Sequence, residues 1–109
     1  MLKVKTAKGS AVNGTCLQGY VDVSFSTLVD VFGNPNGDGD GYKTDAEWEL
    51  KFSDGVYATI YNYKDGKNYN GPSGTPKTQI TDWHVGGMSA RAVRNVEEML
   101  ERFYASEAV

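Results

Sequence analysis

The strongest constraint on the fold is a short stretch in which apolar and charged residues alternate. Trp48, Leu50 and Phe52 are separated by a glutamate and a lysine, and this period of two is typical of a strand with one buried face. A turn-forming triplet, 53–55, follows and leads into a second strand-like run, 56–63. The pattern therefore predicts a β-hairpin.

The register of this hairpin follows from the same pattern. A two-residue loop would leave Ala58 and Ile60 on the polar face, whereas a three-residue loop with Gly55 in the left-handed conformation places them opposite the apolar residues of the first strand. We expect the three-residue loop. The residues that then share the opposite face are Tyr57, Thr59, Tyr61 and Tyr63, beside Glu47, Glu49 and Lys51.

Two strands and a short helix are predicted before the hairpin. Apolar patterning over 2–7 and 15–23 indicates strands,. Ser24 is a suitable helix N-cap, and Gly33 suits the position just after a helix end,. A helix from about Phe25 to Phe32 is expected between them.

After the hairpin, the polar segment 64–78 shows no periodicity and is expected to be a loop. Residues 79–85 indicate a last strand that Gly86-Gly87 should end, and Ser89 should cap a C-terminal helix,. The apolar face of this helix carries Val93, Val96, Leu100 and Phe103. The whole chain, 1–109, is therefore expected to be a single α+β domain. It should have an antiparallel sheet of about five strands and two helices on one face, in the order ββαββ-loop-βα.

Composition limits the classes of partner and the compartment. The formal net charge is −3, so the chain has no basic excess for nonspecific nucleic-acid binding. Cys16 is the single cysteine, which excludes an internal disulfide and is compatible with a reducing cytoplasm. No apolar segment reaches the roughly 20 residues that cross a bilayer. We expect a cytoplasmic protein without a membrane partner, with Cys16 as a small buried hydrophobe.

Several motifs also carry a resemblance. They are the run from Glu47 to Gly55, the run Ala58 to Lys64, the sequence Trp83 to Gly87 before a helix, and the helix end Phe32 to Pro35. With these motifs, the chain from about Gly19 to Val96 resembles a group of small, mostly uncharacterised proteins encoded by bacteriophages. The resemblance assigns no catalytic residues to this chain. It implies a small phage protein that acts on a host macromolecule or host defence, with an anti-CRISPR inhibitor as one possibility.

The leading hypothesis for a site is a partner-binding surface on the tyrosine-lined face. Tyrosine is enriched at the energetic centres of protein interfaces. The alternatives are that these tyrosines only solvate the sheet or that a second copy of the chain covers them. The predicted partner-binding residues are Tyr57, Tyr61, Tyr63, Lys64, Tyr69 and His84. The expected partner is a host or defence-system protein.

A second hypothesis places a nucleotide or phosphate ligand at the start of the C-terminal helix. Backbone N–H groups at a helix N-terminus attract anions, and glycines permit close approach. An ordinary glycine turn with a serine cap explains the same sequence. The residues of this alternative site are Gly86, Gly87, Ser89, Arg91 and Arg94.

Catalysis and metal binding have weaker signals. His84 is the only histidine; it suits a general base beside Asp82 or Tyr61, but one histidine without a second ligand does not build a zinc site. Residues 34–45 place oxygens at several EF-hand positions, but Asp45 stands where a bidentate glutamate is needed,. We expect a solvated turn there, no metal, no cofactor and no enzyme activity, with an enzyme that uses His84 as the third alternative.

Overall fold

The predicted hairpin forms with the expected register. In the computed structural model, which describes residues 1–7, 12–37 and 39–107, strand β3 (Glu47–Phe52) pairs with β4 (Tyr57–Tyr61), and Trp48 lies opposite Ile60. Gly55 has a φ of +88°, the left-handed conformation that the three-residue loop requires. One face of the hairpin is therefore buried, and the other carries the tyrosines of β4 beside the charged residues of β3.

The hairpin is the centre of a five-stranded antiparallel sheet in the order β1-β3-β4-β5-β2. The other strands are β1 (Val4–Thr6), β2 (Cys16–Asp22) and β5 (Asp82–Gly87). The α+β fold class is confirmed. The prediction that the two glycines end the last strand is wrong, because Gly86 and Gly87 pair with both neighbouring strands.

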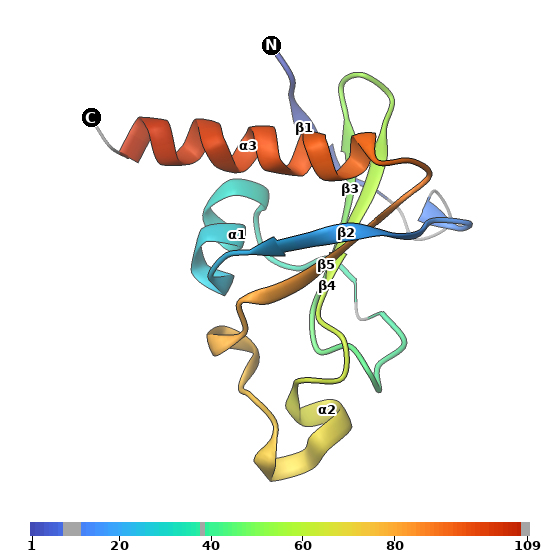
Figure 1. The fold of residues 1–109 in the computed structure, drawn as a ribbon, viewed down its shortest axis with the longest axis vertical. Coiled ribbons are helices and arrows are strands. Elements are labelled where there is room, and N and C mark those ends of the chain that lie inside the picture. Colours follow the sequence, from blue (N-terminus) through green and yellow to red (C-terminus); the bar gives the residue numbers. More distant parts are fainter. Residues whose placement is uncertain (8–11, 38, 108–109) are drawn as a thin grey trace.

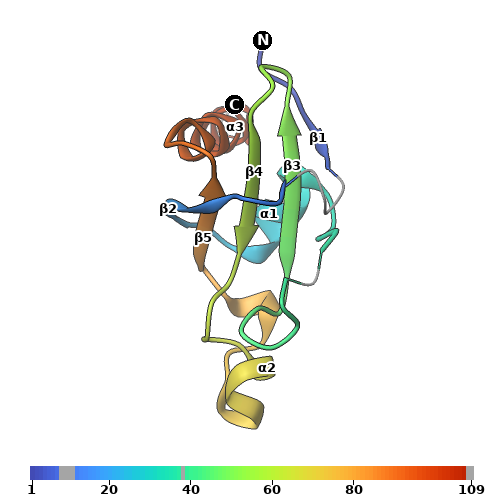
Figure 2. The same cartoon turned by 90° about the vertical axis from the view of Figure 1, so that its right-hand side faces the viewer.

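Two helices, α1 (Phe25–Phe32) and α3 (Arg91–Glu107), lie behind the sheet in Figure 2. The segment that leads into β2 crosses in front of it. Ser24 caps α1 as expected, since its Oγ accepts from the Thr27 amide at 3.1 Å. The 64–78 segment is not a plain loop, because it contains a short helix, α2 (Lys67–Asn70), and two 3-10 turns. In the part of the chain described, no helix is long and apolar enough to cross a membrane.

The core lies between the sheet and these two helices. Trp48 and Trp83 are fully buried at its centre. Val96 and Leu100 of α3 are buried as predicted, and Val93 packs at the margin of the core. The prediction that Phe103 belongs to the core is wrong: it is only half-buried. The C-terminal part of α3 extends beyond the sheet (Figure 1), and the Phe103 ring lies 5.9 Å from that of its neighbour Tyr104.

Candidate interaction face

The sheet face opposite α1 and α3 carries a row of side chains that crosses four strands. Tyr20 of β2 pairs with His84 of β5, His84 pairs with Tyr61 of β4, and Tyr61 pairs with Glu47 of β3. Residues that are directly opposite in neighbouring strands point to the same face. Residues from the two ends of the chain therefore meet on one surface.

His84 lies at the centre of three tyrosine rings. The Tyr20 ring meets the imidazole edge to face, with centroids 4.8 Å apart at 82°. The rings of Tyr61 and Tyr63 lie 5.4 Å and 5.5 Å from it. Tyr20 is 58% exposed and Tyr63 is 42% exposed. We call these four residues the tyrosine face: rigid aromatic side chains with polar tips, three of which are held by strand pairing, and which are at least partly exposed to solvent.

Lys64 extends the tyrosine face toward α2. It is a non-glycine residue with a φ of +63°, held there by its amide, which donates to the Lys43 carbonyl at 2.8 Å. Its Nζ lies 5.2 Å from the Tyr63 ring centroid and 5.5 Å from that of Tyr69. The Tyr69 ring in turn lies 5.1 Å from that of Tyr42. Cation–π contacts of this kind keep a lysine side chain against aromatic rings.

The structure thus brings together five of the six residues predicted for partner binding, and it adds two. The residues brought together are Tyr61, Tyr63, Lys64, Tyr69 and His84. Tyr57 shares the sheet face but lies at the other end of β4, beneath Lys51 Nζ at 5.3 Å. Tyr20 and Tyr42 were missed. The signal for Tyr20 is its alternation with Val21, which becomes informative only once β2 is known to pair with β5.

Beside the tyrosine face lies a hollow of about 470 Å³. It is bounded by the segment that crosses in front of the sheet in Figure 2, by the loop after residue 38 and by the strands themselves. The described lining residues are Val12, Asn13, Thr15, Cys16, Gly39, Asp40, Thr44, Glu47, Glu49, Thr59, Tyr61, Tyr63 and Gly86. The expectation that Cys16 is buried is wrong; it begins an edge strand and its side chain is exposed.

The electrostatics of the hollow are acidic. Burial, and then the neighbouring Glu47 carboxylate, raise the pKa of the Tyr61 phenol above its ordinary value,. The pKa of Asp40 is lowered, chiefly because its carboxylate accepts from the Tyr42 amide at 3.0 Å. Tyr61 therefore keeps its proton, while Asp40 keeps its negative charge.

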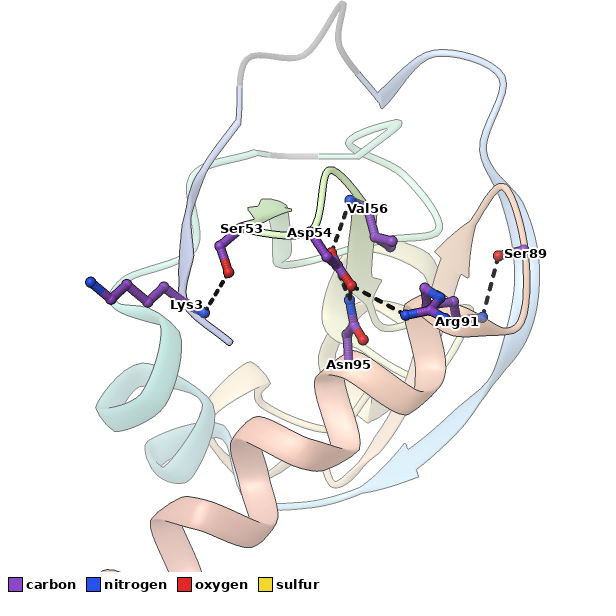
Figure 3. Close-up of polar contacts among 7 residues, drawn as sticks. All are labelled: Lys3, Ser53, Asp54, Val56, Ser89, Arg91 and Asn95. Carbon is purple, nitrogen blue, oxygen red and sulfur yellow. Dashed lines mark hydrogen bonds and ion pairs between the residues drawn. The ribbon is translucent and has the colours of Figure 1, made fainter. Parts of the chain in front are cut away.

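The alternative anion site receives less support. Gly86 and Gly87 are strand residues, so their backbone groups belong to the sheet and do not form a free N–H cradle. Ser89 Oγ accepts from the Arg91 amide at 3.3 Å, and Arg91 forms an ion pair with Asp54 at 3.6 Å (Figure 3). Arg94 is exposed on α3. The region is used to dock the helix on the hairpin turn.

The structure also shows what surrounds the other candidate groups. In the described part of the chain, His84 makes ring contacts and no side-chain hydrogen bond, so neither Asp82 nor Tyr61 orients it as a base. In the 34–45 segment, Asn36 Oδ1 accepts from the Glu49 amide at 2.8 Å. Asp45 contacts Asn62 and the Asn68 amide. Asp38 lies outside the described residues. These loop oxygens serve the backbone and neighbouring side chains.

No protein-family model matches the chain, and no curated protein matches its sequence.

Proposed function

We propose that this chain is a small binding protein whose tyrosine face engages a host macromolecule. The observation that carries the proposal is the cluster of three tyrosine rings around His84 on the sheet face that no helix of the described residues covers. Rigid aromatic side chains supply contact area at low entropic cost, and such residues dominate binding energy at interfaces. A folded sheet face of this composition is suited to recognition.

The resemblance to phage-encoded proteins supplies the biological context of the proposal. The partner is then a protein of the infected bacterium, met in its cytoplasm, and binding inhibits or redirects it. A component of a defence system, CRISPR–Cas included, is the specific candidate. The net charge of −3 suits a partner with a basic surface,.

The experiment is affinity capture from bacterial lysate with three tagged variants. The double variant Tyr61→Ala/Tyr63→Ala should lose a protein that the wild type captures in stoichiometric amount. Because Tyr61 is half-buried, Tyr20→Ala serves as a second variant with less risk to the fold. Met88→Ala is the control, since Met88 is 67% exposed and lies between β5 and α3, outside the tyrosine face. Capture that survives in both face variants would contradict the proposed surface.

The defence role has its own measurement. Expression of the wild type in a strain with an active CRISPR–Cas system should raise phage plating at least about tenfold, and the double variant should not. A second copy of the chain is the competing occupant of the face. Sedimentation of the purified protein separates the two, because a dimer that dissociates in Tyr20→Ala would assign the face to self-association.

A further inference from the structure

Small residues line the bottom of the hollow beside the tyrosine face. Glu49, Thr59 and Gly86 form a second cross-strand row, next to the row that contains His84. A Cβ atom on Gly86 would lie 2.4 Å from Thr59 Oγ1. Any larger residue there would fill the floor. The glycine therefore keeps the hollow open down to the backbone of β5.

Thr59 is a polar side chain with no partner in the described structure. The residue is 95% buried, since its relative exposure is 5%. Its hydroxyl forms no hydrogen bond to any described residue, although it lines the hollow. No buried side-chain oxygen of the described residues lacks a hydrogen-bond partner, so the unpaired Thr59 hydroxyl is exposed to the hollow. The hydroxyl is available to a ligand in the hollow.

Negative charge converges on the same space. Carboxylate oxygens of Glu47 and Glu49 approach one point beside Gly37, where a Cβ atom would lie 3.1 Å and 2.9 Å from them. The Glu49 carboxylate makes no hydrogen bond or ion pair with a described residue. Asp40 adds a third negative charge. Lys43 is a neighbouring cation that helps to lower the pKa of Asp40. Of these carboxylates, we therefore assign the ligand to Glu49.

The opposite wall is aromatic. Tyr61 and Tyr63 line the hollow, and ring faces attract cations that lie against them. A volume of about 470 Å³ falls in the range of small-ligand sites, about 300 to 1,000 Å³. Carboxylates, a hydroxyl acceptor and aromatic rings in one cavity form the set of groups that recognises an organic cation.

We propose that this hollow is a binding site for a guanidinium or primary ammonium group. The Glu49 carboxylate and the Thr59 hydroxyl accept its N–H donors, and the tyrosine rings flank its alkyl chain. The cation is either a basic side chain of the proposed partner or a free amine. That the cation belongs to a partner rests on the proposed function, whereas the binding site itself does not.

Titration of the purified full chain tests the site without any partner. The probes are agmatine, Nα-acetyl-arginine N-methylamide and its neutral isostere, Nα-acetyl-citrulline N-methylamide. The two cations should give saturable shifts in the NMR signals of the Thr59 and Gly86 amides. The citrulline compound should bind at least about tenfold more weakly, because it lacks the charge that strengthens these hydrogen bonds. Equal binding of the neutral compound, or no saturable shift with either cation, would overturn the proposal.

Two isosteric variants assign the contacts. Glu49→Gln should weaken agmatine about tenfold or more, and Thr59→Val should weaken it several-fold. Neither residue belongs to the tyrosine face. Glu97→Gln, an exposed glutamate on α3, removes the same charge elsewhere and should leave affinity unchanged. Undiminished binding in Glu49→Gln, with the fold verified by circular dichroism, would exclude the hollow as the site.

The probes also separate the two sources and the two proposals. Binding of the blocked arginine shows that a side chain attached to a peptide backbone fits, whereas binding of agmatine alone assigns the site to a free amine. Cation binding without any captured partner would refute the proposed function and keep this site. If the wild type captures a partner that Tyr20→Ala does not, but binds neither cation, the proposed function is supported and this site is refuted.

Discussion

Trp48 and Trp83 hold the two ends of α1 against the sheet. Their rings meet edge to face, with centroids 5.3 Å apart at 83°. The indole N–H of Trp48 donates to the Gly33 carbonyl at 2.8 Å, and that of Trp83 donates to the Val23 carbonyl at 3.0 Å. These carbonyls lie on either side of the helix. One aromatic pair therefore fixes the helix at both its start and its end.

Replacement of Trp83 by phenylalanine should destabilise the fold through the Val23 carbonyl. The change removes the donor and leaves a buried acceptor unpaired, which costs about 1–3 kcal/mol of unfolding free energy in addition to any loss of packing. Urea unfolding followed by circular dichroism measures it. Trp48→Phe should cost less, because the hydrogen bond from Trp48 is only partly buried. Equal costs would contradict the argument from burial.

Among the polar residues of the loops, Asn62 should be the one whose replacement lowers the unfolding free energy most. Its fully buried side chain accepts from the amides of Asp45 and Ala46 and donates to the carboxylates of Asp45 and Asp65. Asn62→Leu keeps the volume but removes these bonds, so the unfolding free energy should fall by about 3 kcal/mol. The control is Asn34→Ala, an exposed asparagine, which should stay within about 0.5 kcal/mol. A tolerated leucine would show that the loop is held by other contacts.

Asp54 makes the stability depend on acid pH. Its carboxylate accepts from Asn95 Nδ2 at 2.9 Å and pairs with Arg91 (Figure 3). The Asn95 hydrogen bond is the main reason that the pKa of Asp54 is lowered from 3.8. A carboxylate whose folded pKa is depressed adds stability above its unfolded pKa and loses it as the pH falls through the folded value.

The comparison is therefore between the wild type and Asp54→Asn in urea unfolding from pH 7 to pH 3. The wild type should be more stable near neutrality, and the difference in unfolding free energy should shrink below about pH 4. A difference that stays constant over this range would mean that the ionised form of Asp54 does not matter.

Gly87 permits the close approach of α3 to the sheet. A Cβ atom there would lie 2.4 Å from the Ala92 Cβ, so Gly87→Ala should cost about 1–3 kcal/mol by overpacking. Ala92→Gly should cost about 1 kcal/mol through helix propensity. In the double variant the second change makes room for the first. The double variant should therefore lose less unfolding free energy than the sum of the two single losses, by at least about 0.5 kcal/mol. Additive costs would show that this contact does not set the packing.

The sequence by itself determined the hairpin and the faces of its strands. Trp48 and Tyr61 lie on the expected sides because the side-chain period of a strand is two and the three-residue turn at Gly55 fixes which residues are opposite,. The bounds of α1 were equally local, since Ser24 and Gly33 satisfy the helix ends within a few residues of the chain,. The predicted tyrosine-lined surface follows from these local rules.

The tertiary structure decided what joins that surface. Tyr20 reaches His84 only because β2 pairs with β5, a contact between segments more than 60 positions apart that no local pattern specifies. Gly86 continues β5 because it pairs with β2 and β4, and glycine suits this position because Thr59 occupies the space of a side chain. The hollow exists because the segment before β2 and the loop after residue 38 both approach β4. Local periodicity determines which way a side chain points, but packing between distant segments determines which side chains lie beside it.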